Sequence, residues 1–444
     1  MREVPNRKIL RQIILFSLVV FLIAPIISPT AAQGIDVLVS EDVETYLTQT
    51  MENGEIPTIQ VGIIEDGELR YARGFGEQTS LDNVFPIGSV QKMFVAMAVL
   101  QVYEDGLLDL DADVNDYLPF ILTHPRYQNI SITPRLLLYH RSGLVSEMYY
   151  TFCWDTKGVF YPELKSVYNS EIIKMSLADF CYATLASEGE YYWPNSVWDF
   201  EPDTQYGYSS VGYQVLMYLV ELVSGMLFPD FVQANILDPL NMTHTGFNVS
   251  ALEHHAAPHI RYNGTNREVS VWEGNYVIRS NVQDVFKFLL VHMNQGSYGE
   301  VQILEPTTVE MMREIGSAYG GTLYGLSHRG YGMAVHSYEG DVYGHSGSSI
   351  GGIMTVFFSP SKQKGLIFMS NLNHVCSYNM DDVEFVNKYF NEANEYLLKV
   401  SSLAPAISER ELIIIACISI VVLGISYNSY NFWKKRSKTN QAQI

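Results

Sequence analysis

The sequence predicts an α+β protein in which an antiparallel sheet is flanked by helices and accompanied by a helical subdomain. Three observations indicate this class: a β-hairpin pattern near the start, helical hydrophobic periods in the middle and strand-like runs near the end. Elements in this order bury their apolar faces if the first and last strands share one sheet. The roughly 370 residues between positions 33 and 401 are enough for a large core, in one large domain or two closely packed subdomains.

The opening hairpin is expected over residues 58–64 and 68–73. Apolar and polar residues alternate in both runs, as they do in strands that bury one face. Glu65, Asp66 and Gly67 separate the two runs and supply the polar and glycine residues of a tight turn. The two runs are therefore expected to be neighbouring antiparallel strands.

Helical patterns and then strand patterns follow the hairpin. Apolar residues recur at helical spacing in five segments, at residues 90–104, 171–185, 211–223, 282–293 and 307–315. Short runs typical of strands occur at residues 331–338, 342–345, 350–358 and 366–370. A last helical pattern covers residues 381–400. This order is what an antiparallel sheet with helices inserted in its middle would produce.

The first 32 residues have the order of a secretory signal peptide. Four basic residues precede an apolar stretch at residues 13–27, and small residues follow Pro29. An uncleaved membrane anchor is the alternative, but Pro25 and Pro29 interrupt the stretch where a longer spanning helix would continue. In either case we expect the domain at residues 33–400 to lie outside the cytoplasm.

A linker at residues 401–411 leads to a second apolar segment, for which we expect a transmembrane helix at residues 412–430. A helix from residue 411 to residue 434 would span roughly 33 Å at about 1.5 Å per residue, enough for a bilayer core of about 30 Å. The basic tail at residues 431–444 would then stay in the cytoplasm. The expected location is the cell membrane, with a single span. A surface helix is the alternative, but residues 412–425 show no polar face.

The net charge excludes one class of partner. The chain carries a formal charge of −20 at pH 7, and because both ends are basic, the part between them is more acidic still. A surface of this kind repels nucleic acid, and no basic stripe offsets the repulsion. The oligomeric state has no signal in the sequence.

The chain contains four cysteines, which limits the disulfides that it can form. Cys417 lies in the expected membrane span, which leaves Cys153, Cys181 and Cys376 outside it. An exported protein could join Cys153 to Cys181, but three cysteines allow three pairings and the sequence does not choose among them. No spacing of Cys and His indicates a metal site, and no cofactor is expected.

Ser89 and Lys92 form the first candidate site. They open an apolar run with helical periodicity, so a separation of three places both side chains on one helical face. A serine hydroxyl becomes a nucleophile when a neighbouring group takes its proton, and a lysine in a dry pocket can do so as a neutral amine. Ser-x-x-Lys recurs at Ser359 and Ser361, but both copies lie around Pro360 in a polar turn where no helix presents them. The first copy is therefore the expected nucleophile and base.

Two further segments carry candidate residues. Tyr208 precedes the helix at 211–223, and a tyrosine that faces a lysine ammonium can have a lowered phenol pKa and pass protons to a leaving group. His345, Ser346 and Gly347 belong to a glycine-rich strand run, where a ligand could lie against the strand edge. Backbone N–H groups of that edge can hold an oxyanion, and the imidazole offers a further ring donor. An ordinary core tyrosine and a glycine-rich strand turn are the alternatives.

Taken together and in this order, the three elements resemble those of the penicillin-recognising serine hydrolases. The most similar branch contains class C β-lactamases, D-alanyl-D-alanine carboxypeptidases and family VIII-type esterases. Residues 85–88, 137–144 and 238–242 also resemble recurring segments of that family. The resemblance covers about residues 37–373 and implies a β-lactamase/transpeptidase-like fold for the domain at residues 33–400.

The resemblance implies a role for each candidate residue. By this resemblance, Ser89 matches the family's acylated serine, Lys92 its activating lysine and Tyr208 its catalytic tyrosine. The third, substrate-binding element matches His345, Ser346 and Gly347. All three elements of the family's site are therefore present in this sequence.

Ser348 and Ser210 complete the implied site. The family's oxyanion hole matches the backbone N–H groups of Ser89 and Ser348. Ser210 stands in the substrate-binding position where β-lactamases and carboxypeptidases usually have asparagine. Because a serine hydroxyl is shorter than a carboxamide, it cannot span to both the lysine and a substrate amide. This departure favours ester hydrolysis or acyl transfer over peptide or lactam cleavage.

The sequence therefore predicts a membrane-tethered, extracytoplasmic serine hydrolase that works through an acyl-enzyme on Ser89. Its partners would be a small-molecule ester, amide or peptide substrate and the membrane itself. One alternative is a D-amino-acid peptidase, a carboxypeptidase or a β-lactamase. The other is a catalytically weak binding protein with the same fold, against which the presence of Ser89, Lys92 and Tyr208 argues.

Overall fold

The computed structural model of the 444-residue chain describes residues 35–145, 175–262, 264–268, 276–323, 326–338, 340–373 and 380–400. The chain divides into two compact units, Met1–Glu55 and Ile56–Ile444. Helix α2 (Ile35–Gly54) is the described element of the first unit, and the elements named below all belong to the second. Every candidate site residue lies in the second unit.

The predicted features of the two chain ends fall outside the described residues. These features are the signal peptide at residues 1–32, the linker at 401–411, the transmembrane helix at 412–430 and the tail at 431–444. In the part that is described, no single helix is long and apolar enough to cross a membrane. Helix α9 (Ser210–Ser224) and the helical segment after it meet at a bend of 77°. Together they satisfy the criterion for a membrane span by length and composition alone. Membrane attachment stays a prediction.

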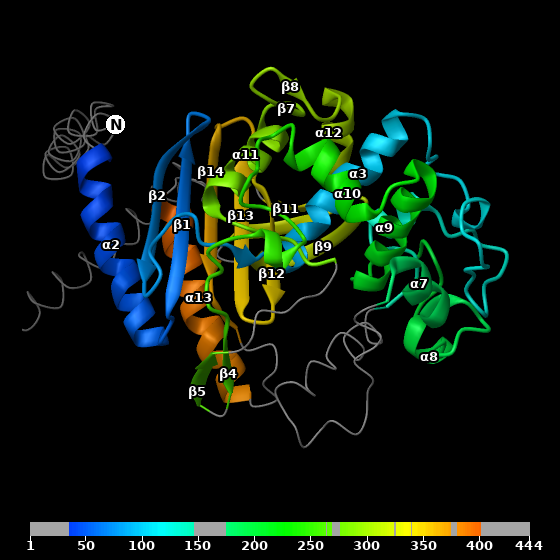
Figure 1. Cartoon of the computed structure of the whole chain (residues 1–444), viewed down its shortest axis with the longest axis horizontal. Helices are drawn as coiled ribbons and strands as arrows, with labels where there is room; N and C mark the ends of the chain where they lie inside the picture. Colours follow the sequence, from blue (N-terminus) through cyan, green and yellow to red (C-terminus); the bar gives the residue numbers. More distant parts are fainter. Residues whose placement is uncertain are drawn as a thin grey trace, which may run out of the picture. The chain divides into compact units, whose positions relative to one another are not determined.

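An eight-stranded antiparallel sheet organises the second unit (Figure 1). Its strand order is β2-β1-β14-β13-β12-β11-β10-β9, and every neighbouring pair is antiparallel. The strands are β1 (Thr58–Glu65), β2 (Glu68–Gly76), β9 (Ser317–Leu323), β10 (Leu326–Tyr331), β11 (His336–Tyr338), β12 (Tyr343–Ser349), β13 (Gly352–Ser359) and β14 (Lys364–Ser370). Ile59 on β1 pairs with Ser370 on β14, so the opening hairpin and the closing strands share one sheet, as predicted.

The inner strands are covered on both faces. Every residue of β13 is buried, although successive side chains of a strand point to opposite faces. Helix α11 (Val282–Met293) packs on β1 and β14, and helix α13 (Met380–Val400) packs on β14. At the approach of α11, Gly62 is required, because an added Cβ would lie 2.6 Å from Val282 Cγ1. The apolar runs of these strands therefore reflect double-sided burial.

The predicted helical subdomain gathers around α9 (Figure 1). Its packing partners are α3 (Gln91–Glu104), α4 (Pro134–Leu138), α7 (Leu177–Leu185) and α10 (Phe228–Val232). The other helices of the second unit include α8 (Pro194–Val197) and α12 (Pro306–Arg313). Short strands are β3 (Phe85–Pro86), β4 (His259–Tyr262), β5 (Thr265–Glu268), β6 (Arg279–Ser280), β7 (Ser297–Tyr298), β8 (Val301–Gln302) and β15 (Leu372–Asn373). Residues 92–100 of α3 are all buried, so this helix forms part of the core on every side.

One predicted strand is divided in two. Residues 331–338 form the end of β10 and the whole of β11, which pair with each other. Between them the N–H of Gly332 donates to Val335 O at 2.8 Å, and Ala334 has a φ of 59°. A left-handed residue reverses the chain, whereas the apolar pattern continues through the turn. The prediction of a single strand is therefore wrong.

Helix α7 is shorter than its predicted range of 171–185. It begins at Leu177 because Ser176 caps it, accepting a backbone hydrogen bond from the first turn. Residues 171–174 lie outside the described part. Cys181 on this helix is a buried free thiol, and burial raises its pKa. Cys153, Cys376 and Cys417 lie outside the described residues.

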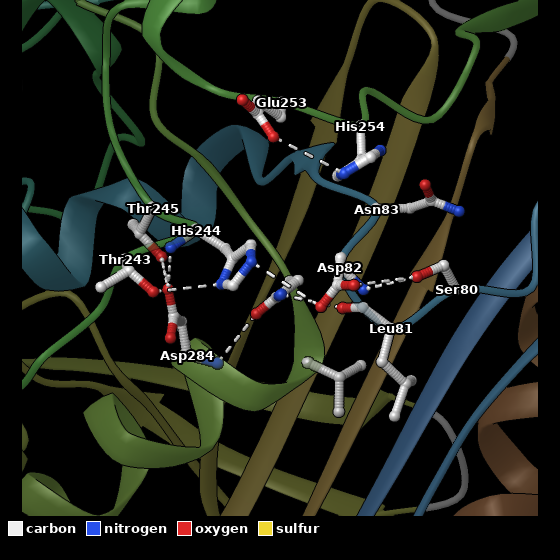
Figure 2. Close-up of polar contacts among 12 residues, drawn as sticks. Ser80, Leu81, Asp82, Asn83, Thr243, His244, Thr245, Glu253, His254 and Asp284 are labelled. Carbon is white, nitrogen blue, oxygen red and sulfur yellow. Dashed lines mark hydrogen bonds and ion pairs between the residues drawn. The ribbon is translucent and has the colours of Figure 1, made fainter.

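A buried carboxylate fixes the start of α11. Asp284 accepts hydrogen bonds from the His244 N–H at 2.7 Å and from the Thr245 hydroxyl at 3.0 Å. Lys287 Nζ lies 2.8 Å from its other oxygen. Figure 2 shows the His244 ring between Asp284 and Asp82, and Oδ1 of Asp82 lies 3.7 Å from Nε2 of His244. Because the buried charge is paired and hydrogen-bonded, this cluster holds α11 in place without contributing a candidate catalytic residue.

Candidate active site

Ser89 lies in a 3₁₀ turn, Gly88–Val90, that leads directly into α3. Lys92 follows in the first turn of α3, and its Nζ lies 3.2 Å from Ser89 Oγ. The lysine is only 5% exposed, so the two groups meet in a largely dry environment. Backbone N–H groups at the start of a helix have no intrahelical partner and favour a developing negative charge. The helical spacing therefore brings the predicted nucleophile and its predicted base into contact.

The other two Ser-x-x-Lys copies are engaged elsewhere. Ser359 Oγ donates to Asp341 Oδ1 at 2.6 Å. The Ser361 N–H donates to the second carboxylate oxygen of Asp341 at 2.7 Å. Lys364, at the start of β14, forms an ion pair with Glu65 at 3.2 Å. These residues stabilise the turn between β13 and β14, as their position around a proline predicts.

Ser209 and Ser210 begin α9 and extend the surroundings of the lysine. Ser209 is the N-cap, and its Oγ accepts the N–H of Gly212 at 3.0 Å. Ser210 Oγ lies 3.2 Å from Lys92 Nζ. The ammonium or amine of Lys92 therefore lies between two serine hydroxyls from different helices, those of Ser89 and Ser210.

Tyr208 precedes this cap and hydrogen-bonds to Ser89. Lys92 Nζ lies 4.8 Å from the centroid of its ring, within cation–π distance. Burial raises the pKa of the Tyr208 phenol, and the hydrogen bond to Ser89 lowers it by less. The predicted lowering of this pKa is therefore wrong. At neutral pH Tyr208 is a neutral phenol, which can donate or relay a proton but is not a phenolate base.

The third element, on β12, packs against the turn that carries Ser89. At Gly347 an added Cβ would collide with Ile87 O and lie 2.9 Å from Ser89 N. At Gly88, whose φ is 54°, it would lie 2.6 Å from Ser348 N. The backbone N–H groups of Ser89 and Ser348 therefore belong to segments in close contact. An oxyanion hole requires two N–H groups near one position, and close contact of these segments is consistent with that requirement.

Gly347→Ala is expected to lower kcat for ester hydrolysis by ~100-fold or more, because loss of one oxyanion-hole donor typically costs about 10²–10³. The added methyl group must push β12 away from the Ser89 turn, since the colliding atoms are backbone. Steady-state kinetics of the purified variant measure the effect. Gly246→Ala is the control, because its Cβ would meet only Leu252 Cδ2, at 3.8 Å. Equal losses in the two variants would contradict the assignment.

His345 on β12 has both ring nitrogens engaged. The Tyr331 hydroxyl lies 2.6 Å from Nε2, and Ser346 O lies 2.6 Å from Nδ1. Because a carbonyl oxygen only accepts, Nδ1 carries the proton and Nε2 accepts from Tyr331. Burial, followed by the charge of Lys92, lowers the pKa of His345 to about 3. The ring donor predicted for a ligand is therefore directed to Ser346 instead, and the imidazole is neutral.

Three polar residues that no candidate motif contains also support the site. They are His140, which accepts the Ser209 N–H at 3.0 Å, Tyr331, and Asn373, whose Nδ2 donates to Ser348 Oγ at 2.8 Å. His140 belongs to the segment 137–144, which carried a family resemblance but no assigned role. Tyr331 and Asn373 lie among ordinary strand residues and have no local signal. Only the packing of distant segments identifies them.

The chain matches the family model described as Beta-lactamase over residues 43–386, which is most of its length. Among curated proteins it is similar to Protein flp of Staphylococcus aureus (strain MRSA252), with 20% identity over 410 residues, 89% of this chain and 75% of that protein. The structure of the octameric penicillin-binding protein homologue from Pyrococcus abyssi has a TM-score of 0.62 and 22% identity, covering 74% of this chain and 73% of that one. EstCE1, a hydrolase with promiscuous acyltransferase activity, has a TM-score of 0.60 and 18% identity, covering 81% and 99%.

Proposed function

Because the chain belongs to the β-lactamase family, we propose that it is a serine hydrolase that forms an acyl-enzyme on Ser89 and prefers small esters or acyl donors over β-lactams. The observation that carries this proposal is the position of Lys92 Nζ, 3.2 Å from Ser89 Oγ and 3.2 Å from Ser210 Oγ. A buried amine in contact with a serine at a helix start is the arrangement that activates a hydroxyl nucleophile.

The proposed acylation uses each residue once. Ser89 Oγ attacks the carbonyl carbon of the substrate while Lys92 accepts the hydroxyl proton. The oxyanion accepts hydrogen bonds from the backbone N–H groups of Ser89 and Ser348. Tyr208, as a neutral phenol, relays the proton from Lys92 to the leaving alcohol. Water or another acceptor then attacks the acyl carbon, its proton passes by the same groups to Ser89 Oγ, and the bond between the acyl carbon and Oγ breaks.

Two features of the site support uncharged, ester-type substrates. His345 is neutral with both nitrogens engaged inside the protein, so it supplies no cation for a substrate carboxylate. Ser210 already contacts Lys92, and its short hydroxyl cannot also hold a substrate amide. Ester alcohols leave more readily than amide nitrogens. Ester hydrolysis therefore depends less on a side chain that holds the substrate amide. The fold that this chain shares with EstCE1 is compatible with ester and acyl-transfer chemistry.

Wild-type protein is therefore expected to hydrolyse a nitrophenyl ester faster than a chromogenic cephalosporin, and Ser210→Asn is expected to narrow the gap. One hydrogen bond to a transition state contributes ~1–3 kcal/mol, so the ratio of lactam to ester activity should rise about 5- to 100-fold. Comparison of kcat/KM for the two substrates measures the ratio.

Ser210→Ala is the matched control for this substitution, because it removes the hydroxyl without adding a carboxamide. The ratio should rise in the Asn variant only. Faster hydrolysis of the cephalosporin by the wild-type protein would overturn the ester preference and favour a β-lactamase. Release of D-amino acids from a peptide, without ester turnover, would favour a peptidase.

We also propose that the hydrolase is tethered to the cell membrane by residues 412–430, with residues 33–400 outside. The basic residues directly after the apolar segment support this orientation. Protease added to intact cells is expected to remove the catalytic domain and spare a tag placed after Ile444. Permeabilised cells, in which both ends should be digested, provide the control. Protection of the domain with loss of the tag would refute the orientation.

A further inference from the structure

His140 binds the backbone N–H groups of the two residues on either side of Tyr208, Gly207 and Ser209. Its carbonyl oxygen accepts the Gly207 N–H at 2.8 Å. Its ring Nδ1 accepts the Ser209 N–H at 3.0 Å. Tyr208 is the residue between these two donors, so one histidine fixes the backbone immediately before and immediately after the tyrosine.

The His140 ring also contacts the tyrosine directly. The centroids of the His140 and Tyr208 rings lie 4.5 Å apart with planes inclined by 34°. Tyr213 and Tyr331 enclose the same imidazole at 4.9 Å and 5.0 Å. The residue is fully buried, so its ring cannot turn without displacing these neighbours. The backbone and the ring of Tyr208 are thus both held by His140.

Two costs accompany this arrangement. His140 has a φ of 55°, a left-handed conformation that is uncommon for a residue with a side chain. Because Nδ1 accepts a hydrogen bond, Nε2 carries the proton, and this buried Nε2 has no hydrogen-bond partner in the described part of the chain. Both the left-handed backbone and a buried unsatisfied N–H are destabilising, so the protein keeps this arrangement at a cost in stability.

We propose that His140 is the positioning residue of Tyr208: it holds the phenol against Ser89 by binding the peptide N–H groups on both sides of the tyrosine. The inference rests on the proposed acyl-enzyme function and assigns a role within that site. The role requires a neutral imidazole, since a protonated Nδ1 would face the Ser209 N–H as a second donor. Burial, followed by the charge of Lys92, keeps the pKa of His140 well below its usual range.

Two substitutions separate the acceptor from the rest of the side chain. In His140→Asn, Oδ1 occupies the place of Nδ1 on Cγ, and asparagine tolerates a left-handed backbone. In His140→Gly the backbone is equally tolerated but the acceptor is lost. His140→Gln, which moves the acceptor by one carbon, replaces the glycine variant if that variant does not fold. The comparison therefore tests the hydrogen bond to Ser209 with the backbone conformation held constant.

The experiment measures hydrolysis of nitrophenyl acetate by the full-length chain and its variants. His140→Gly is expected to lower kcat ~100-fold, as small misplacements of a reacting group do, with KM changed less than about threefold. His140→Asn should recover kcat to within about tenfold of wild type. In a Tyr208→Phe background, His140→Gly should lower kcat by less than about a further threefold, because the phenol hydroxyl that His140 positions is already absent.

His292→Asn is the matched control, because His292 is also fully buried but lies on α11 between Phe288 and Phe358. It should lower the melting temperature and leave kcat of the folded protein unchanged. Equal losses in the Gly and Asn variants, or a full loss in the Tyr208→Phe background, would overturn the positioning role. Absence of Ser89-dependent turnover in the wild-type protein would instead overturn the proposed function, and this inference with it.

Discussion

Ser89→Ala is expected to abolish turnover of activated esters and covalent labelling of the protein by them. The hydroxyl is the attacking group of the proposed reaction, and removal of a nucleophile lowers kcat by roughly 10³-fold or more. Lys92→Met should retain the serine but slow its acylation by about 10²–10⁴-fold, because the proton then has no acceptor. Intact-mass spectrometry after incubation with nitrophenyl esters and with β-lactams measures the adduct, and peptide mapping locates it.

The chain supplies matched controls for this prediction in its other two Ser-x-x-Lys copies. Ser359→Ala and Ser361→Ala should leave both labelling and turnover unchanged, because these serines contact Asp341. An adduct on either of them, or one that persists after Ser89→Ala, would show that the nucleophile is assigned incorrectly.

The stability of the protein is expected to fall steeply between pH 7 and pH 5. Four buried histidines, His124, His140, His292 and His345, have lowered pKa values, with burial as the main cause in each case. A histidine whose folded pKa lies below its unfolded value of about 6.5 binds a proton more readily in the unfolded chain. Its stabilising contribution is therefore complete above that value and is lost as the pH falls toward the folded pKa.

The size of the effect follows from the pKa values of two of these residues, which are about 3 for His292 and for His345. Each should lower the free energy of unfolding by ~2 kcal/mol between pH 7 and pH 5. Their sum of ~4 kcal/mol is large beside a typical total of about 5–15 kcal/mol. Glu221, whose pKa burial raises, opposes the loss. Urea unfolding at pH 7, 6 and 5 measures the dependence.

His292→Asn is the control for the acid effect, because it removes one ionisable group without touching the site. Its free energy of unfolding should be lower at pH 7 but should decline less steeply toward pH 5. If the wild-type protein were equally stable at pH 7 and pH 5, the histidines would not be buried as neutral groups in the way that the structure describes.

Hydrophobic patterns predicted that the first and last strands share one sheet, but they did not predict the full strand order, and they missed β9 and most of β10. Residues 58–64 were predicted as a strand from their alternation and residues 366–370 from a short apolar run, and β1 and β14 occupy those places. The run 331–338 was also predicted as one strand, yet it contains a turn at Ala334. Alternation reports which faces are buried and is insensitive to the φ of a single residue, so the division between β10 and β11 was not predictable from it.

The Ser89–Lys92 contact could be predicted because it is local. Residues three apart on a helix are neighbours whatever the rest of the chain does, and the apolar run after Ser89 predicted that helix. The same reasoning set aside Ser359 and Ser361, whose surroundings predicted a turn. The contact between Lys92 and Ser210 joins residues 118 positions apart, and only the family resemblance anticipated it.

The protonation states in the site were decided by tertiary packing. The sequence suggested a lowered pKa for Tyr208 and a free donor on His345, and both inferences failed because they considered one neighbour at a time. Burial outweighs the hydrogen bond from Ser89 at Tyr208. The Tyr331 hydroxyl, from another strand, donates to Nε2 of His345, so the ring proton lies on Nδ1 and is donated to Ser346 O. The charge of a group depends on how completely surrounding segments exclude water from it. Residue types and spacing thus identify the reacting groups, whereas their ionisation is a property of the folded chain.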